Sequence, residues 1–366
     1  MKDSYKVLGD YIELVDERNK DLSINNLLGV SISKRFIPSI ANIIGTDLSS
    51  YKIVRTGQFA YGPVTSRNGE KVSIAFLYED DCIISSSYSV FKVTDTKQLD
   101  PQYLMLWFSR PEFDRYARYK SHGSVRESFD WDELCQVELP VPHIDKQRDI
   151  VKAYNIISDR VELKRKINDN LLSTASSIYR RMFVENIDQT NLPANWSLAA
   201  LGKVAKLSAG GDRPAVYNDC LSDECSVPIY SNGIDNEGLY GFTDYAKIYD
   251  ESITVSARGT VGYVFLREEP YVPIVRLISV IPNKAFVTAK YLYFALDAID
   301  LQSTGTSQQQ ITVPDFKKRQ IIVPNSTTLD EFTSKVEPLF MAIKQNKVEI
   351  NSLIALQSNF LALLSR

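Results

Sequence analysis

The chain of 366 residues contains few of the side chains that metal centres and disulfide frameworks need. It has two histidines, His122 and His143, and four cysteines scattered along its length. Cys220 and Cys225 have a spacing compatible with a metal-binding knuckle, but no second cysteine or histidine pair completes the ligand set. We therefore expect reduced cysteines and no metal site in this chain.

Long apolar runs are missing as well. Hydrophobic residues make up 44% of the chain, yet none of them form a run of about 18, the length that a membrane-spanning helix needs. The first 19 residues are charged where a secretory signal peptide would be apolar, which favours a cytoplasmic location. The length and the apolar content suffice for two or three domains with cores of their own.

Three common catalytic motifs are absent. The sequence has no N/D-P-P-Y/F motif of adenine methyltransferases, no phosphate-binding G-x-x-x-x-G-K-[ST] and no zinc-binding H-E-x-x-H. Neither histidine stands near a plausible nucleophile in the sequence. We expect no catalytic residue and no cofactor-binding residue in this chain.

Neither sign of charge is in large excess. Lys and Arg number 42 and Asp and Glu 45, a net charge of −3, which argues against a protein that binds nucleic acid by electrostatics alone. Residues 115–126 differ, because they contain four basic residues and no acid: Arg115, Arg118, Lys120 and Arg126. Two interpretations are open for this segment, a solvated helix end and a surface that contacts nucleic acid.

The sequence contains an internal repeat. Residues 123–142 align without a gap with residues 305–324, 182 positions later, and three of the twenty aligned residues are identical. Apolar character is kept where identity is not, so the pattern and not the identity indicates a duplication. The matched apolar pairs are Phe129 with Ile311, Trp131 with Val313, Leu134 with Phe316, and Leu139 with Ile321.

Each copy of the repeat leads into a long helical segment, residues 145–183 and 328–366. In the second, apolar residues fill eight of ten a/d heptad positions: Phe332, Val336, Leu339, Ile343, Ile350, Leu353, Phe360 and Leu364. Such a seam must be buried, and an antiparallel coiled coil of the two helices is the simplest solution. Pro338 predicts a kink in the second helix. Lys164 and Asn346 are polar seam positions that we expect to lie near each other and to fix the register.

The sequence therefore predicts an α+β protein with two mixed α/β domains in a tandem pseudo-repeat, joined by two long helices. The expected divisions are a first domain at 1–142, a first helix at 143–185, a second domain at 186–324 and a second helix at 325–366. Strands are expected at 73–77, 82–84 and 90–93, and at 252–255, 263–266 and 277–281. Asp100 and Thr288 are expected to cap the N-termini of equivalent helices.

Four short motifs carry a family resemblance. They are Leu192-Pro193-Ala194-Asn195-Trp196, Gln147-Arg148-Asp149-Ile150, the turn Ser256-Ala257-Arg258-Gly259-Thr260-Val261-Gly262, and Gly123 and Arg126 followed by Leu134 and Pro140-Val141-Pro142. In this order and spacing the whole chain resembles the specificity subunit of type I restriction–modification enzymes. The second helix departs from the pattern, because it opens with Leu329-Asp330-Glu331-Phe332 and not with Q-x-x-I.

The resemblance implies a DNA-reading subunit without catalytic activity. Each recognition domain would read one half of a bipartite target on double-stranded DNA, and the helices would set the spacing between the halves. The helices would also dock two methylation subunits, and motor nuclease subunits would complete the restriction complex. S-adenosylmethionine and ATP are expected on these partner subunits and no cofactor on this chain, and no membrane is involved.

Base edges require Arg, Lys, Asn or Gln side chains, and phosphates require cations, hydroxyls and accessible backbone N–H groups. The candidate DNA-binding residues of the first domain are Tyr61, Thr65, Arg67, Asn68, Lys120, Ser121, Ser124 and Arg126. Those of the second are Arg213, Ser231, Asn232, Arg258, Gly259, Thr260, Thr304, Thr306, Ser307 and Gln308. Surface ion pairs are the alternative for Arg67 and Arg213, and a loop tip without contacts is the alternative for residues 304–310.

Two functions of other classes remain alternatives. One is an enzyme that acts on nucleic acid by itself, which methyl transfer by the isolated chain would reveal. The other is a coiled-coil scaffold that binds proteins without DNA specificity, a role that suits the net negative charge. A mobility-shift assay with duplex DNA, alone and with methylation subunits, separates the scaffold from a DNA-binding protein.

Overall fold

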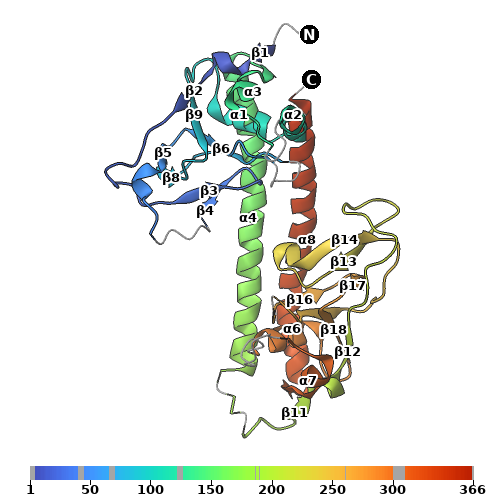
Figure 1. Ribbon diagram of the computed structural model, residues 1–366. Coiled ribbons are helices and arrows are strands. Elements are labelled where there is room, and N and C mark those ends of the chain that lie inside the picture. Colours follow the sequence, from blue (N-terminus) through green and yellow to red (C-terminus); the bar gives the residue numbers. More distant parts are fainter. Residues whose placement is uncertain are drawn as a thin grey trace. The chain divides into compact units, whose positions relative to one another are not determined.

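The computed structural model divides the chain into two compact units (Figure 1). The first unit contains residues 1–165 and 348–366, and the second contains residues 166–347. Each has a hydrophobic core of its own. The structure describes residues 5–39, 45–65, 71–121, 127–185, 187–188, 190–259, 261–299 and 310–364.

The first unit is built around a four-stranded antiparallel sheet. Its strand order is β2-β9-β6-β7, formed by Ile12–Val15, Ser89–Val93, Phe59–Tyr61 and Ile74–Phe76. Three antiparallel pairs accompany it: β1 (Tyr5–Val7) with β10 (Glu138–Pro140), β3 (Leu28–Val30) with β4 (Phe36–Pro38), and β5 (Lys52–Val54) with β8 (Cys82–Ile84). The strands expected near 73–77, 82–84 and 90–93 are confirmed as β7, β8 and β9.

Three short helices and two 3-10 turns complete this domain: α1 (Pro101–Phe108), α2 (Pro111–Lys120), α3 (Trp131–Cys135), η1 (Leu8–Asp10) and η2 (Leu48–Ser50). The predicted cap of α1 is confirmed, because the Asp100 carboxylate accepts hydrogen bonds from the N–H groups of Gln102 and Tyr103. Helix α1 places Phe108 edge-on to Phe59, at 5.9 Å between ring centroids, and so closes one face of the sheet.

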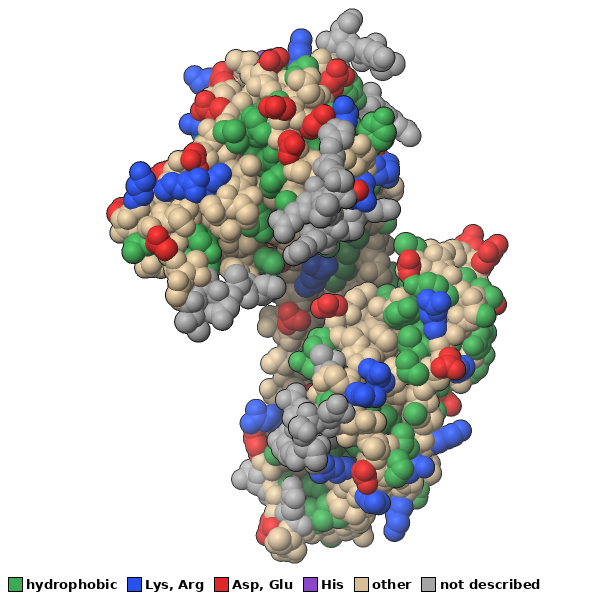
Figure 2. All heavy atoms as spheres, viewed as in Figure 1, with side chains coloured by type: hydrophobic (Ala, Val, Ile, Leu, Met, Phe, Trp, Pro, Cys, Tyr) green, Lys and Arg blue, Asp and Glu red, His purple; other side chains and the backbone are tan. Residues whose placement is uncertain are grey.

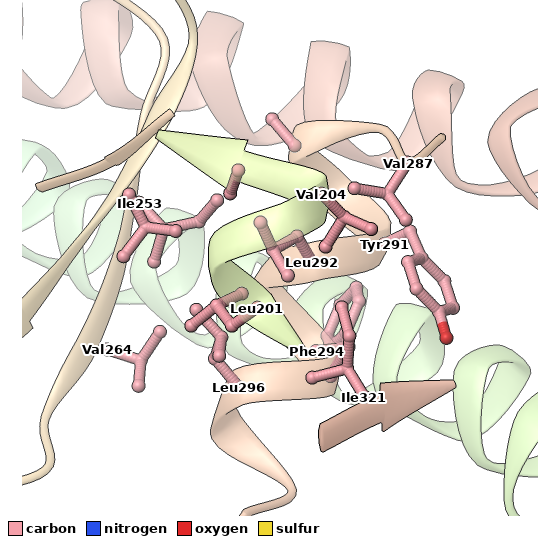
Figure 3. Packing of buried hydrophobic residues seen from close by; sticks show 14 of the residues in the cluster. Leu201, Val204, Ile253, Val264, Val287, Tyr291, Leu292, Phe294, Leu296 and Ile321 are labelled. Atoms are coloured by element: carbon pink, nitrogen blue, oxygen red, sulfur yellow. The ribbon is translucent and has the colours of Figure 1, made fainter. Parts of the chain in front are cut away.

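The second unit contains a sheet of the same connectivity, β12-β18-β15-β16, formed by Ala205–Ala209, Leu277–Pro282, Ser252–Ser256 and Val264–Arg267. A second sheet has the order β14-β13-β17 (Leu239–Thr243, Val227–Tyr230 and Val272–Pro273), and β11 (Ser197–Ala200) pairs with β19 (Gln320–Val323). The helices are α5 (Leu201–Val204), η3 (Asp235–Gly238), α6 (Ala289–Asp297) and α7 (Val313–Lys318). Figure 3 shows side chains of α5, α6 and the sheet meeting in the core, among them Leu201, Leu292 and Ile253.

The predicted duplication is present in the fold. Strand pairs β1–β10 and β11–β19 are equivalent, and so are the two four-stranded sheets. The backbone agrees in detail, because Leu8 N–H donates to the carbonyl of Val137 and Leu201 N–H donates to that of Arg319, both at 2.8 Å. The positions of Val137 and Arg319 differ by the same offset as the two copies of the sequence repeat. The units differ in the strands outside the main sheet: the described residues of the first form the pairs β3–β4 and β5–β8, and those of the second form the three-stranded sheet β14-β13-β17.

Two long helices run through both units, α4 (Ile144–Phe183) and α8 (Ser326–Leu363). In the first unit Tyr154 lies against Phe360, with ring centroids 6.0 Å apart, and Gln357 Nε2 donates to Ser158 Oγ at 2.7 Å. Residue numbers that rise along α4 and fall along α8 show that these segments are antiparallel. Helix α8 continues through Pro338. The supercoil and the kink stay predictions.

The two segments are also antiparallel in the second unit. Asn346 Nδ2 donates to Asn168 Oδ1 at 2.8 Å, and Phe332 packs edge-on against Phe183, with centroids 5.2 Å apart. Lys164, which we expected near Asn346, forms an ion pair in the first unit with Glu349, at 2.9 Å. Among the described residues, no helix has both the length and the hydropathy to cross a membrane.

Candidate nucleic-acid interface

In the first unit, the loop after β6 lies beside the segment that precedes α3. Val64 forms an antiparallel bridge with Ser128, and Phe129 N–H donates to the carbonyl of Pro63 at 2.8 Å. The described parts of the two candidate stretches of this domain also meet, because Thr65 Oγ1 donates to Ser121 Oγ at 3.0 Å. Four of these candidates lie outside the described residues: Arg67, Asn68, Ser124 and Arg126.

The second unit repeats this arrangement. Arg258 forms an antiparallel bridge with Gln310, and Ile311 N–H donates to the carbonyl of Ala257 at 2.9 Å. The candidate pair Ser231 and Asn232 lies beside this bridge, because Asn232 Nδ2 donates to the carbonyl of Arg258 at 2.6 Å. The candidates Thr260, Thr304, Thr306, Ser307 and Gln308 lie outside the described residues.

The turn that carries Arg258 depends on its glycines. Gly259 and Gly262 have φ angles of +81° and +92°, which glycine adopts without the steric cost of a Cβ. Ser256 closes the turn, since its Oγ accepts from Tyr263 N–H at 2.9 Å and its carbonyl from Gly262 N–H at 2.9 Å. Small residues and fixed backbone geometry thus hold Arg258 at the tip of a short loop.

Arg258 is exposed and forms no ion pair with another described residue. Arg267 is the opposite case, because it is 2% exposed, lies 3.5 Å from the ring of Tyr230 and is paired with Glu237. Burial lowers the pKa of its guanidinium. The side chain of Arg258 is therefore available to a ligand, whereas that of Arg267 stabilises the fold.

Two candidates of the first domain are corrected. Tyr61 is 1% exposed, and its ring packs edge-on against Phe91, 6.1 Å away; burial raises the pKa of its hydroxyl. Thr65 is 2% exposed. Its Oγ1 lies 3.0 Å from Ser121 Oγ and 3.2 Å from the carbonyl oxygen of Glu127, and it can donate to either. Tyr61 is therefore a core residue, and Thr65 fixes the loop to the end of α2. Alternation along an extended chain turned these side chains inward.

The basic segment 115–126 has acidic partners from other parts of the first unit. Lys120 Nζ lies 3.3 Å from a carboxylate oxygen of Glu133, and this carboxylate raises the pKa of Lys120. Arg118 pairs with Glu127, and Arg115 pairs with Glu112 at 3.1 Å. The described part of the segment is largely neutralised, by Glu112 and Glu127, which flank it in the sequence, and by Glu133, which the fold brings to it.

Arg213 lies among aromatic side chains. Its guanidinium is 4.7 Å from the ring of Tyr217, and Nη1 is 3.4 Å from the hydroxyl of Tyr240. The preceding Gly210 has a packing role, because a Cβ there would lie 2.1 Å from the carbonyl oxygen of Ile274. Ser231 belongs to the backbone turn of η3, with its N–H donating to the carbonyl of Gly238 at 2.8 Å.

One exposed cation at this site was not among the candidates. Arg276 has a φ of +73°, which is strained for a residue with a side chain, and its carbonyl accepts the N–H of Ala257 at 3.0 Å. It therefore lies next to the Arg258 loop. No sequence pattern marks it, because its position depends on a contact between separate strands.

The surface and the donor groups limit what this site can bind. On the face that Figure 2 shows, basic and acidic side chains are interspersed over both units, in agreement with the small net charge. Within the described ranges, no three or more His, Cys, Asp or Glu side chains are placed to hold a metal ion. The site offers arginine, amide and hydroxyl groups, which suit base edges and phosphates.

The comparisons with known proteins agree with this geometry. The family model described as type I restriction modification DNA specificity domain matches residues 40–173 and 193–353. A Mycoplasma pneumoniae protein, provisionally named a type I specificity subunit, is 26% identical over 330 residues, 85% of each chain. The specificity subunit of the type I restriction enzyme MjaIX from Methanocaldococcus jannaschii is 24% identical, over 68% of this chain and 64% of its own.

A solved structure shares the fold. The crystal structure of a type I restriction–modification system S subunit from M. genitalium superposes with a TM-score of 0.58 at 15% identity, over 99% of this chain and 96% of that chain. The matches of the family model, one in each half of the chain, define the class, a protein that specifies a DNA target. The chain belongs to the type I restriction–modification DNA specificity family and is a specificity subunit. The relatives give no support to a protein-binding scaffold without DNA specificity.

Proposed function

We propose that each of the two units reads one half of a bipartite DNA target and that α4 and α8 set the distance between the halves. The observation that carries this proposal is the repeated bridge, Val64–Ser128 in one unit and Arg258–Gln310 in the other. Equivalent backbone positions hold side chains of different chemistry, as two readers of different sequences require.

The charges at the candidate interface indicate how strongly the isolated chain binds DNA. Positions such as Arg258 and Arg276 supply isolated cations, whereas Lys120 and Arg118 are already paired with carboxylates. Among the described residues of the candidate interface few cations lack a carboxylate partner, and an interface with few such cations gains little from counterion release. We therefore infer that tight, specific binding needs partner subunits and that the isolated chain binds DNA weakly.

The partners follow from the same proposal. Two methylation subunits dock on the helices and supply S-adenosylmethionine, and restriction subunits supply ATP-driven translocation and cleavage. This chain has a non-catalytic role and orients the DNA for its partners, in the cytoplasm where the DNA is found. The support for this role is the family membership.

Methylation mapping tests the function directly. The genome of the host is sequenced for modified adenine with and without the gene for this chain. A bipartite motif with a fixed non-specific spacer should disappear in the deletion and return on complementation. An unchanged methylome would contradict the proposal, and methyl transfer by the purified chain alone would contradict its non-catalytic role.

A further inference from the structure

The bridges of the two units occupy the same position of the duplicated fold. Ser128 and Gln310 are matched by the offset of the sequence repeat, and each precedes an apolar residue, Phe129 or Ile311, whose N–H bonds the opposite loop. Val64 follows β6 by three residues, and Arg258 follows β15 by two. Val64 and Arg258 are therefore structural equivalents, although no alignment of the loops by residue type suggests it.

The loop residue of each bridge, Val64 or Arg258, has an exposed side chain, and Ser128, the partner of Val64, is half-buried. In the first unit the neighbours Thr65 and Phe129 are 2% and 0% exposed, whereas Val64 is 39% exposed. In the second unit Ala257 belongs to the core, and the adjoining Arg258 and Gln310 are exposed. Since partners in an antiparallel bridge project to the same side, each unit presents one pair of side chains outward.

We propose that this cross-strand pair is the same base-reading position in both units, with a different base requirement in each. In the second unit Arg258 recognises a guanine through its N7 and O6 atoms, with Gln310 beside it. In the first unit Val64 contacts the 5-methyl group of a thymine. These are the pairings that the major-groove edges favour for an arginine and for a small apolar side chain. The inference rests on the proposed function and adds the base class at one position of each half-site.

The test for the first unit removes only the thymine methyl group. The methyltransferase assembled from this chain and its methylation subunits is titrated with duplexes in which each thymine of the half-site is replaced in turn by deoxyuridine. The half-site that belongs to the first unit is assigned by exchanging residues 1–142. One replacement should weaken binding about fourfold, the factor for one buried methyl group. Val64→Ala should abolish this sensitivity.

A matched apolar control is Ile37→Ala on β4, in the same unit and 40% exposed. This variant should keep the full response to deoxyuridine, and both variants should have an unchanged Tm, since both side chains are on the surface. Equal binding of every deoxyuridine duplex by the unaltered complex would overturn the role of Val64. So would a Val64→Ala complex with the same fourfold response.

The test for the second unit replaces each guanine of the other half-site by 7-deazaguanine, which lacks the N7 acceptor. One replacement should weaken binding about tenfold, the order of magnitude for a bidentate arginine–guanine contact. Arg258→Ala should weaken binding of the natural duplex about tenfold as well. The variant should then bind the 7-deazaguanine duplex as well as it binds the natural duplex. The control is Lys284→Ala, which removes an exposed cation two residues after the end of β18. This variant should still bind the 7-deazaguanine duplex about tenfold more weakly than the natural duplex.

The remaining outcomes separate this inference from the proposed function. If Arg258 contacts only a phosphate, Arg258→Ala weakens all duplexes equally and 7-deazaguanine has no effect, which overturns the base assignment alone. If the complex methylates a bipartite motif but neither deoxyuridine nor 7-deazaguanine weakens its binding at any position, the base assignment alone is likewise overturned. The absence of any bipartite motif overturns the proposed function and this inference together.

Discussion

Tyr291 donates a hydrogen bond from its hydroxyl to the backbone carbonyl of Ile322, 2.6 Å away, and Tyr103 donates in the same way to Pro140 at 3.0 Å. Ile322 and Pro140 are again equivalent positions of the sequence repeat. In each unit this bond joins the helix after the main sheet to the strand that leads into a long helix. Both tyrosines are buried, and burial raises the pKa of Tyr103 to about 12.

The first prediction concerns this bond. Tyr291→Phe should lower the free energy of unfolding of the second unit by about 1–2 kcal/mol, because the hydroxyl is lost without a change in ring packing. Calorimetry of the full chain resolves the transition concerned. Tyr249→Phe is the control, since that side chain is 71% exposed, and it should leave the unfolding temperature unchanged. Equal effects of the two variants would show that the bond contributes nothing.

The second prediction concerns Gln147, the first residue of the Q-x-x-I motif. It is fully buried, its Nε2 donates to the carbonyls of Gln98 and Pro142 at 2.8 and 2.7 Å, and its Oε1 accepts from Asp100 N–H at 2.8 Å. Gln147→Leu should destabilise the first unit by about 2–4 kcal/mol, because three backbone groups lose their partner. Denaturant unfolding measures the change.

Gln136→Leu serves as the control for Gln147→Leu, since Gln136 is exposed at the end of α3, and a change within about 0.5 kcal/mol is expected. The second unit shows why leucine is the relevant substitution. Leu329 is the repeat equivalent of Gln147 and is buried in the core of that unit. The departure of the second helix from Q-x-x-I is thus an exchange of a polar anchor for an apolar one. A stable Gln147→Leu variant would show that the two anchors are interchangeable.

The third prediction concerns acid stability. Arg55 and the N–H of Thr56 hold the Asp81 carboxylate, with bonds of 2.7 and 2.8 Å, and lower its pKa. A carboxyl group whose pKa is lower in the folded state stabilises the fold above its unfolded pKa of about 3.9. This contribution is lost as the pH falls through the folded value. Asp81→Asn should therefore have a lower Tm than the unaltered chain at pH 7, and the difference should shrink below about pH 4.

Asp80→Asn is the matched control for this pH dependence, because Asp80 is the exposed neighbour of Asp81 and the substitution removes the same charge. The Tm difference between the control and the unaltered chain should vary little from pH 7 to pH 3. A difference for Asp81→Asn that grows on acidification would contradict the assigned direction of the shift.

The fourth prediction concerns modularity. Replacement of residues 1–142 by the corresponding domain of another family member should change one half of the methylated motif and leave the other half intact. The reason is that each unit has its own core and its own bridge position. Methylation mapping of the chimera reads both halves at once. A chimera that altered both halves would show that the units do not read independently.

The fifth prediction concerns the distance between half-sites. Insertion of four residues before Leu171 lengthens α4 by about 6 Å, close to two base pairs of duplex. Because Asn168 bonds Asn346 in an antiparallel pair, the compensating insertion belongs near Ile343. The doubly extended chain should methylate the same half-sites with a longer spacer. An active variant with the original spacer would show that the helices do not set the distance.

The sequence by itself determined the duplication, the long helices and the strands β7, β8, β9, β15, β16 and β18, because these depend on patterns of apolar residues along the local sequence. It did not indicate β2, β6 and β12, which complete the two main sheets. Phe332 and Leu134 could be assigned to the core from their spacing alone, and both are fully buried. The caps at Asp100 and Thr288 follow from short-range hydrogen bonding, and both were predicted correctly.

Only the tertiary structure decided which loop residues are available to DNA. Tyr61 and Thr65 have suitable chemistry but point inward, and Lys120 is paired with an acid, Glu133, that belongs to another helix. The equivalence of Val64 and Arg258 depends on a bridge between segments far apart in the chain. Such contacts leave no local pattern, since the side-chain direction at a loop position is set by the backbone that packs against it.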